Sequence, residues 1–503
     1  MTDNILSLFD MEWIHFGIAK SIQEIHDCKI FGIIDIDNNM KSFFKNQDIV
    51  KLEKQWFYRD FLDKNDLTYD VNFLQSFEEK YNVDLWNVAF SERFFIDYNP
   101  YYKFTYDEIL SILYRECKLF DSILDEINPD FLLIKFTDSH QSHLLHQMCK
   151  ANQIKTLMLG PTRFGGRFTI YDEYEIIQDY KDDNSYIGNE RTESELKNYL
   201  DKYDTLKTLK PFVSATKKSF SKRTRNYLHN LTIMGDSTIN NYYAHYGKTK
   251  LKAIKQFIFL KRWYRKKFID NNFKRNIDPK SKFVYYPLHV DPERQLLLVA
   301  PYYTNQLEII THIAKSLPIG FKLFVKEHGM MHIGGWRPIS YYQQIMNLPN
   351  VELIHPDVNS KTLLESCSLV VTINGTTGLE AVFYKKPVIA FSNVSYSMIN
   401  SVSTIDKIED LPQQIKSMLK SNTMSSDLNN YIDLVERNSF EIDMSSLYLN
   451  FSKKFSKEYN PAKSSISEQQ MSMFIKENND SFQKLAQEHV NKIKNYHNRL
   501  EKN

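Results

Sequence analysis

From Lys282 to Phe391 the sequence alternates short apolar runs with amphipathic stretches, and this alternation constrains the fold more than any other feature of the chain. The apolar runs have the length of buried strands, and the stretches between them have the apolar spacing of helices. Repeated strand–helix–strand units form a parallel sheet that is covered by helices. We therefore predict a parallel α/β domain. Its expected strands are residues 282–289, 321–328, 351–356, 368–373 and 386–391, and its expected helices are residues 304–317, 339–348 and 359–367.

The first 200 residues carry a similar pattern. Apolar runs at 29–37, 130–138 and 154–161 predict strands, and residues 139–153 predict a helix between the last two. The expected fold is therefore α/β, with two Rossmann-like parallel-sheet domains that face a cleft. Because ligands bind outside the carboxyl ends of parallel strands, the residues that directly follow strands are the candidates for function.

A strongly basic segment separates the two patterns. Between Lys207 and Lys282 there are 20 Lys and Arg against three Asp, so this stretch carries +17 and the rest of the chain −15, given the overall +2. Its interleaved aromatic residues suit a helix on an anionic membrane surface. The alternative is a solvated basic helix that packs on the acidic body. No helix-turn-helix, RNA-recognition or zinc-finger pattern occurs, so we expect no nucleic-acid partner.

These changes in composition set the expected domain boundaries. An N-terminal Rossmann-like domain is followed by a basic helical segment, a C-terminal Rossmann-like domain and a helical tail. The predicted ranges are 1–204, 205–280, 281–440 and 441–503.

Cysteine usage and hydropathy indicate the compartment. The four cysteines have no CxxC spacing and are expected to be reduced core thiols, as in a cytosolic protein. The first residues lack the basic and apolar regions of a signal peptide, and no apolar run approaches the ~18 residues of a membrane span. We expect a cytoplasmic protein, attached at most peripherally to the inner face of the cell membrane.

A loop of small residues follows the expected strand at 368–373. It consists of Asn374, Gly375, Thr376, Thr377 and Gly378. Hydroxyls and backbone N–H groups at a helix N-terminus bind anions, so this loop is a candidate phosphate site. The alternative is that Thr376 or Thr377 only caps the helix, with Glu380 completing a capping box.

Two other loops of the same domain carry polar side chains after strands. Lys326, Glu327 and His328 end the strand at 321–328, and a histidine there can donate a ring N–H to a phosphate oxygen. His289 and Glu293 follow the strand at 282–289. For each of these residues, an ordinary solvated loop position is the alternative.

The N-terminal domain offers its own candidates. Asp138 and His140 follow the strand at 130–138, and Arg163 and Arg167 lie among glycines after the strand at 154–161. A carboxylate at this place can act as a general base on an acceptor hydroxyl, and capping of the next helix by Asp138 or Ser139 is the alternative. His140 and the two arginines are candidates for acceptor contacts or for structural roles. The histidine spacing is a poor match to a metal site, so no metal is expected.

The motifs "YYPLHVDPE", "FKLFVKEH" and "LLESCSLVVTINGTTGLEAVFYKKPVIAF", within residues 283–391, resemble the capsule-polysaccharide biosynthesis family. That family includes bacterial transferases of 3-deoxy-D-manno-octulosonic acid (Kdo) with the two-domain GT-B glycosyltransferase fold. "TLMLGPTRFGGRFTIYDE" looks like a segment of related surface-polysaccharide proteins. The resemblance thus implies a nucleotide-sugar-dependent glycosyltransferase.

The resemblance also implies residue roles. In GT-B enzymes that use CMP-sugars, a His-Pro motif and a pair of hydroxyl residues grip the nucleotide phosphate. His328 matches the histidine, although Gly329 replaces the proline, and Thr376 with Thr377 matches the hydroxyl pair. His355, in a literal His-Pro, would lie near the base or ribose, and Glu380 resembles the acidic residue on the ribose.

These inferences combine into one main hypothesis. The chain would transfer a sugar, Kdo-like or otherwise acidic and carried by CMP, onto a surface polysaccharide or lipid-linked acceptor. Asp138 and His328 would be the catalytic residues, and no cofactor beyond the nucleotide-sugar co-substrate is expected. A UDP-sugar glycosyltransferase or UDP-sugar 2-epimerase is the first alternative, and a non-catalytic scaffold for glycan assembly is the second.

Overall fold

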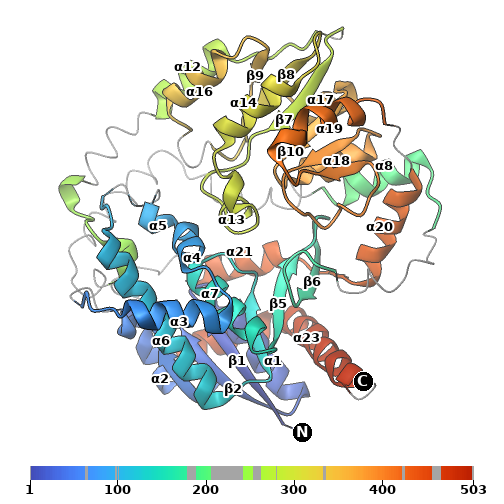
Figure 1. Ribbon diagram of the computed structural model, residues 1–503. Helices are drawn as coiled ribbons and strands as arrows, with labels where there is room; N and C mark the ends of the chain where they lie inside the picture. The colour runs from blue at the N-terminus through green and yellow to red at the C-terminus, as the bar shows by residue number, and fades with distance from the viewer. Residues whose placement is uncertain are drawn as a thin grey trace. The chain divides into compact units, whose positions relative to one another are not determined.

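The computed structural model describes residues 2–62, 66–96, 99, 101–177, 189–204, 242–252, 262–278, 280–331, 336–421, 425–455 and 466–500. The chain forms two compact units, each built around one sheet (Figure 1). Unit 1 comprises Met1–Ile176, Tyr203–Ala253 and Ser439–Asn503, and unit 2 comprises Ile177–Lys202 and Ile254–Asn438. The domain ranges expected from the sequence stay a prediction.

The unit 1 sheet has seven strands in the order β13-β6-β5-β4-β1-β2-β3. Strands β1 to β5 pair in parallel, whereas β6 and β13 are antiparallel to their neighbours. The strands are β1 (Asp3–Phe9), β2 (Cys28–Ile34), β3 (Leu52–Phe57), β4 (Phe131–Lys135), β5 (Lys155–Pro161), β6 (Arg167–Tyr171) and β13 (Phe440–Glu441). The predicted strands at 29–37, 130–138 and 154–161 are confirmed as β2, β4 and β5.

Helices cover this sheet. They are α1 (Ile14–Ile25), α2 (Lys41–Asn46), α3 (Val71–Tyr81), α4 (Leu85–Ser91), α5 (Arg93–Ile96), α6 (Tyr106–Ile127), α7 (His140–Ala151), α21 (Met444–Phe455), α22 (Glu468–Glu477) and α23 (Asn479–Leu500). The long helix α6 begins at a capping box in which Thr105 and Glu108 satisfy each other's backbone N–H groups. Four of the five residues of β4 are buried, as in a strand that is covered on both faces.

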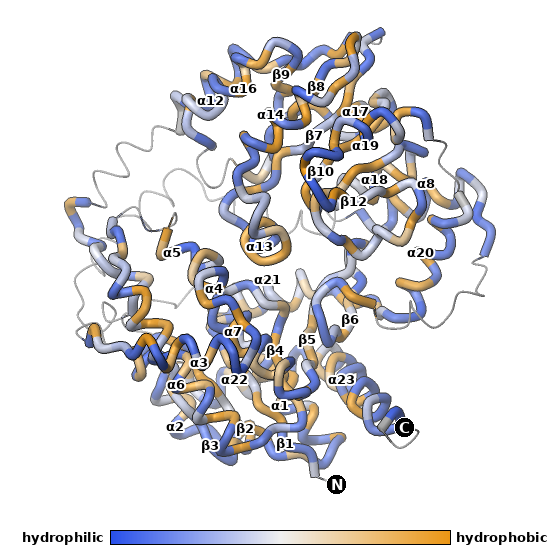
Figure 2. The backbone as a smooth tube through the Cα atoms, viewed as in Figure 1, coloured by the Kyte–Doolittle hydropathy of each residue, from blue (hydrophilic) through white to orange (hydrophobic). Residues whose placement is uncertain are grey.

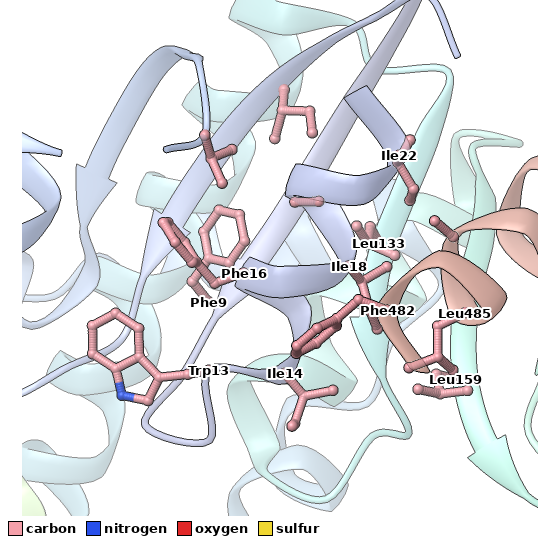
Figure 3. Close-up of a cluster of buried hydrophobic side chains, with 14 of the residues drawn as sticks. Phe9, Trp13, Ile14, Phe16, Ile18, Ile22, Leu133, Leu159, Phe482 and Leu485 are labelled. Carbon is pink, nitrogen blue, oxygen red and sulfur yellow. The ribbon is translucent and has the colours of Figure 1, made fainter. Parts of the chain in front are cut away.

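The C-terminal helices belong to the core of unit 1. Hydrophobic and hydrophilic residues alternate along α23 (Figure 2), and its apolar face packs on α1. Phe482 and Leu485 of α23 lie beside Ile14 and Ile18 of α1 in one buried cluster (Figure 3). The expected tail of amphipathic helices is therefore present, and it completes the N-terminal sheet domain.

The unit 2 sheet has six parallel strands in the order β12-β11-β10-β7-β8-β9. They are β7 (Phe283–Pro287), β8 (Lys322–Lys326), β9 (Val351–Ile354), β10 (Leu369–Thr372), β11 (Val388–Ala390) and β12 (Val402–Thr404). The helices are α8 (Glu193–Lys202), α12 (Arg262–Asn272), α13 (Arg294–Leu297), α14 (Gln306–Ser316), α16 (Ile339–Met346), α17 (Ser360–Ser366), α18 (Thr376–Phe383), α19 (Leu411–Met418) and α20 (Ser425–Arg437). Every strand and helix expected between 282 and 391 is confirmed.

Two further results concern the sequence expectations. The prediction of two Rossmann-like parallel-sheet domains is confirmed, but β1, a central strand of the first sheet, was not predicted. Most of the basic segment, at 205–241 and 253–261, lies outside the described residues, which include only its parts around Tyr243–His245 and α12. Within the described part of the chain, no helix is both long and apolar enough to cross a bilayer.

Candidate active site

The small-residue loop of unit 2 leads directly into α18. Gly375 is the N-cap of this helix, and no side chain caps it. Thr376 and Thr377 occupy the first helical turn, are half-buried, and their hydroxyls make no hydrogen bond to any residue that the structure describes. The alternative of a capping box with Glu380 is therefore wrong. These hydroxyls and the first backbone N–H groups of α18 are donors of the kind that an anion site uses.

The two glycines of this loop permit close packing. A Cβ on Gly375 would lie 2.9 Å from Oγ1 of Thr372 and 3.2 Å from Cε1 of His289. A Cβ on Gly378 would lie 2.4 Å from the hydroxyl of Tyr396, which donates to the Gly375 carbonyl at 2.6 Å. The loop is therefore held tightly against its neighbours.

Asn374 is buried beneath the loop. Its Nδ2 donates to the Gln295 carbonyl, which fixes the start of α13, and its Oδ1 has no hydrogen-bond partner among the described residues. The side chain thus links the β10 loop to the β7 loop and keeps one unused acceptor.

His328 follows β8 and is held as a neutral hydrogen-bond donor. Its Nδ1 accepts a hydrogen bond from the Met330 backbone N–H at 3.2 Å, which leaves the proton on Nε2. Burial, with smaller contributions from Lys326 and Arg337, lowers the pKa of His328 to about 4. At neutral pH the ring therefore presents an N–H group without a positive charge.

Lys326 ends β8 and supplies the positive charge. Its Nζ donates to Ser360 Oγ at 2.7 Å. Burial lowers the pKa of Lys326 to about 8, against the opposing effects of Glu380 and Asp357. Glu380 of α18 is thus within electrostatic range of Lys326, so the β8 and β10 loops contribute to one region.

A buried ion pair supports these loops from behind. Glu327 is 1% exposed, and its Oε2 accepts from Arg337 Nε at 3.1 Å and from the Tyr342 hydroxyl at 2.6 Å. Arg337 also donates to the His289 carbonyl and pairs with Asp291 at 3.3 Å. The network therefore joins the loops after β7 and β8, and Glu327 faces the interior. Arg337 was not among the sequence candidates.

The remaining candidates of unit 2 lie at the same end of the sheet. The His289 backbone N–H donates to Gln306 at 2.8 Å, and its Nε2 lies 3.2 Å from Thr372 Oγ1. Glu293 is the N-cap of the short helix α13. His355 is buried after β9, with Nε2 3.0 Å from Asp270 and 2.7 Å from Arg275, so it is engaged with α12 and the residues that follow that helix.

Unit 1 has a separate cavity at the carboxyl ends of β1, β2 and β4. Its volume is about 240 Å³. Lys135 is one of its lining residues, with Nζ at 2.9 Å from Asp10, 3.1 Å from Asp138 and 3.2 Å from Glu12. Asp138 thus pairs with lysine, and Ser139 rather than Asp138 is the N-cap of α7.

The two acidic residues that follow β1 were missed because β1 itself was not predicted. Burial would lower the pKa of Lys135, but Asp10, Asp138 and Glu12 outweigh it and hold that pKa well above the ordinary value. Burial raises the pKa of Glu12, with Asp10 and Asp138 adding to the rise against the opposing charge of Lys135. A carboxylate with a raised pKa is a stronger base at neutral pH.

The other candidates of unit 1 are part of its interior. His140 is fully buried, with Nδ1 2.5 Å from Glu92 and Nε2 2.8 Å from Glu116. Arg163 pairs with Glu175 at 2.7 Å, and Arg167 donates to Ser439 at 2.9 Å and joins β6 to the return strand β13. Across the described residues there is no group of three or more His, Cys, Asp or Glu side chains that could hold a metal ion.

Comparisons with solved structures find relatives of low similarity. The beta Kdo 2,7 transferase KpsC of Thermosulfurimonas dismutans is 11% identical, with a TM-score of 0.31, and the match covers 86% of this chain and 99% of that one. The UDP-GlcNAc 2-epimerase from Neisseria meningitidis is 13% identical, with a TM-score of 0.27 and coverage of 87% and 99%. At these values the likeness carries no argument about this chain. No curated protein matches the chain significantly.

The family comparison is more informative. Residues 189–407 match the model of a family described as capsule polysaccharide biosynthesis protein. This stretch contains all six strands of the unit 2 sheet and the loop that carries Thr376 and Thr377. The resemblance inferred from the sequence motifs is therefore confirmed over residues 189–407.

Proposed function

We propose that the chain is a glycosyltransferase of capsule or related surface-polysaccharide synthesis, with the sugar donor on unit 2 and the acceptor on unit 1. The observation that carries this proposal is the set of donor groups at one end of the unit 2 sheet. These are the neutral Nε2–H of His328, the ammonium of Lys326 and the two unengaged hydroxyls of Thr376 and Thr377. The family match over 189–407 supports the same reading.

The leaving phosphate is the group that these side chains stabilise. As the glycosidic bond to phosphate breaks, negative charge develops on the phosphate oxygens. Preorganised N–H and O–H donors stabilise that charge more than they stabilise the ground state, which lowers the barrier. The buried pair of Glu327 and Arg337 keeps His328 and the β7 loop in place. A CMP-sugar, Kdo-like or otherwise acidic, is the proposed donor.

The acceptor hydroxyl is the nucleophile, and it must lose a proton as it attacks. Asp138 and Glu12 are the proposed acceptors of that proton in the unit 1 cavity, where they share Lys135. Glu12 is favoured by its raised pKa. The sugar passes to the acceptor oxygen, the nucleotide leaves with the bonding electrons, and the proton moves to the carboxylate.

The donor site is tested by thermal shift of the full chain with CMP, UDP and GDP. CMP is expected to raise the melting temperature, and His328→Ala should remove most of that shift. His312→Ala, on the outer side of α14 and about one-third exposed, is the matched control and should respond like the wild type. Stabilisation by UDP instead of CMP would contradict the CMP donor. If none of the nucleotides stabilises the protein, the transferase proposal fails.

Peripheral attachment to the cytoplasmic face of the membrane is also proposed. On unit 1, Trp86 and Phe90 are 40% and 61% exposed at a cavity of about 660 Å³. Lys252, at the described edge of the basic segment, donates to the Tyr101 carbonyl in the wall of that cavity. Exposed aromatic residues beside lysines suit an anionic bilayer.

Vesicle sedimentation tests this attachment. The full chain should sediment with phosphatidylglycerol vesicles and stay in solution with phosphatidylcholine vesicles. The double variant Trp86→Ser, Phe90→Ser should bind several-fold less, whereas Ile319→Ser, an exposed site on unit 2, should bind normally. Equal binding by both variants would contradict a role for this surface.

A further inference from the structure

The unit 1 cavity is lined by more acidic than basic side chains. Asp10, Glu12, Asp35 and Asp138 contribute four carboxylates, and Arg59 and Lys135 contribute two cations. With these groups ionised, the lining carries a net charge of about −2, because only two of the four carboxylates are balanced. A ligand that brings another negative charge is disfavoured here.

Both cations are already paired with carboxylates. Lys135 has three N–H donors, and each of the three carboxylates around it lies within 3.2 Å. Arg59 donates to Asp35 from Nε at 2.7 Å and to Asp37 from Nη1, and its guanidinium lies 4.2 Å from the centre of the Tyr242 ring. To bind an anionic sugar, the cavity would have to break these ion pairs.

One buried group of the cavity still lacks a partner, and it is an acceptor. Gln141 is 5% exposed and lines the cavity, and its Nε2 donates to Asp35 at 3.0 Å. Its Oε1 is buried and has no hydrogen-bond partner among the residues that the structure describes. A buried carbonyl without a partner is costly, so this position favours a ligand that donates an O–H.

From these contacts we propose that the unit 1 cavity binds an uncharged, hydroxyl-rich sugar unit of the acceptor glycan and excludes uronic and other acidic sugars. Hydroxyl groups donate to the carboxylate oxygens and to Gln141 Oε1, and they need no free cation. The cavity volume of about 240 Å³ is below the range of drug-sized pockets. This size suits a single sugar ring. This inference rests on the proposed function and names the acceptor class.

The experiment compares sugars that differ only at C6. Methyl glucoside and methyl glucuronide, and methyl galactoside and methyl galacturonide, are titrated into the full chain and followed by saturation-transfer NMR. At least one neutral glycoside is expected to bind about tenfold or more tightly than its uronide. CMP binding is measured on the same samples, because it reports the donor site independently.

Variants of the cavity sharpen the comparison. The pair Glu12→Gln, Asp138→Asn removes two negative charges and should bring the preference for the neutral sugar within about threefold. Gln141→Leu should weaken binding of the neutral glycoside. Glu173→Gln removes a carboxylate that pairs with Lys150 outside the cavity, and it should leave the preference unchanged.

The outcomes separate this inference from the proposed function. Equal or tighter binding of the uronides overturns the inference, and so does a failure of all four glycosides to bind while CMP binds normally. A preference that survives the double variant also overturns it, since charge would then not be its cause. If the wild-type chain prefers the neutral glycosides but does not bind CMP, the result would instead contradict the transferase proposal.

Discussion

The ring of Phe482 occupies the space above Gly17, where a Cβ would lie only 2.3 Å from Cε1 of the ring. Through this contact α23 packs on α1, so residues from the N-terminal and C-terminal parts of the chain share one core. Phe482→Ala is expected to destabilise unit 1 by about 3–5 kcal/mol, through lost burial and the cavity left behind. Urea unfolding followed by far-UV circular dichroism measures the change.

The control for this contact is Met473→Ala on α22, which is half-exposed and should change stability by less than about 0.5 kcal/mol. Gly17→Val should be at least as damaging as Phe482→Ala, because the added side chain cannot share the space with the ring. If both core variants unfold like the wild type, α23 does not pack on α1 in solution.

His140 is expected to be a charged residue within the core. Burial would lower its pKa, but Glu116 and Glu92 outweigh burial and raise it to about 10. His140→Ala leaves two carboxylates buried and should cost about 3–5 kcal/mol, whereas Lys150→Ala, at an exposed ion pair, should cost less than about 1 kcal/mol.

The pH dependence of the His140 effect has a definite sign. Because the folded pKa is raised above the ordinary value of 6.5, the stabilisation is fully present below pH 6.5 and is lost as pH rises toward about 10. The difference in unfolding free energy between wild type and His140→Ala should therefore shrink between pH 6.5 and 10. A difference that stays constant over this window would show that the imidazole is neutral in the folded protein.

The second sheet could be predicted because its strands are short, continuous apolar runs between amphipathic helices. Val370 and Val371 of β10, for example, are fully buried. The strand β1 lacks this signal. Its sequence DNILSLF contains the buried polar residues Asp3 and Ser7, so it does not read as a buried strand. Missing β1 also meant missing Asp10 and Glu12, which follow it.

Side-chain partners could not be predicted, since they depend on tertiary contacts. His140 followed a strand and resembled a cleft residue, yet its partners Glu92 and Glu116 are 48 and 24 residues away in the sequence. Glu327 likewise stood beside His328 in the motif, although its side chain turns inward to Arg337. The position of a loop was predictable, whereas the direction of each side chain was not.

Lys326 should make nucleotide binding sensitive to alkaline pH. Since burial lowers its pKa to about 8, the ammonium is present at pH 7 and lost above pH 8. The affinity of the wild type for CMP is expected to fall by several-fold between pH 7 and 9. The variant Lys326→Met should bind CMP weakly, with little dependence on pH. Titration calorimetry at several pH values measures both.

The control for Lys326 is Lys322→Met on the same strand. Lys322 is half-exposed and its hydrogen bond to Glu352 raises its pKa, so it stays charged over this range. This variant should keep the wild-type pH profile. A wild-type affinity that does not change between pH 7 and 9 would exclude Lys326 from the phosphate site.

Protonation of Glu12 should determine how the rate of the transfer reaction falls at acid pH. Its raised pKa predicts that kcat/KM falls with acid at a pH above the ordinary glutamate value of 4.5. Glu12→Gln is expected to lower kcat by about 10²–10⁴-fold with CMP binding unchanged. Asp138→Asn is the informative partner variant, because a larger loss there would make Asp138 the base. Near-normal kcat in both variants would remove the proton acceptor from this cavity.

Gly375 tests whether the small-residue loop must pack closely to bind phosphate. Gly375→Ala adds a Cβ 3.2 Å from His289 and 2.9 Å from Thr372 Oγ1, so the loop has to shift away from β7. A shift of this kind moves the Thr376 and Thr377 hydroxyls, and CMP affinity is expected to drop by about tenfold or more with only a small change in melting temperature. Gly329→Ala places its Cβ in open space beside His328 and should bind CMP like the wild type. If Gly375→Ala binds CMP normally, the nucleotide phosphate does not rest on the N-terminus of α18.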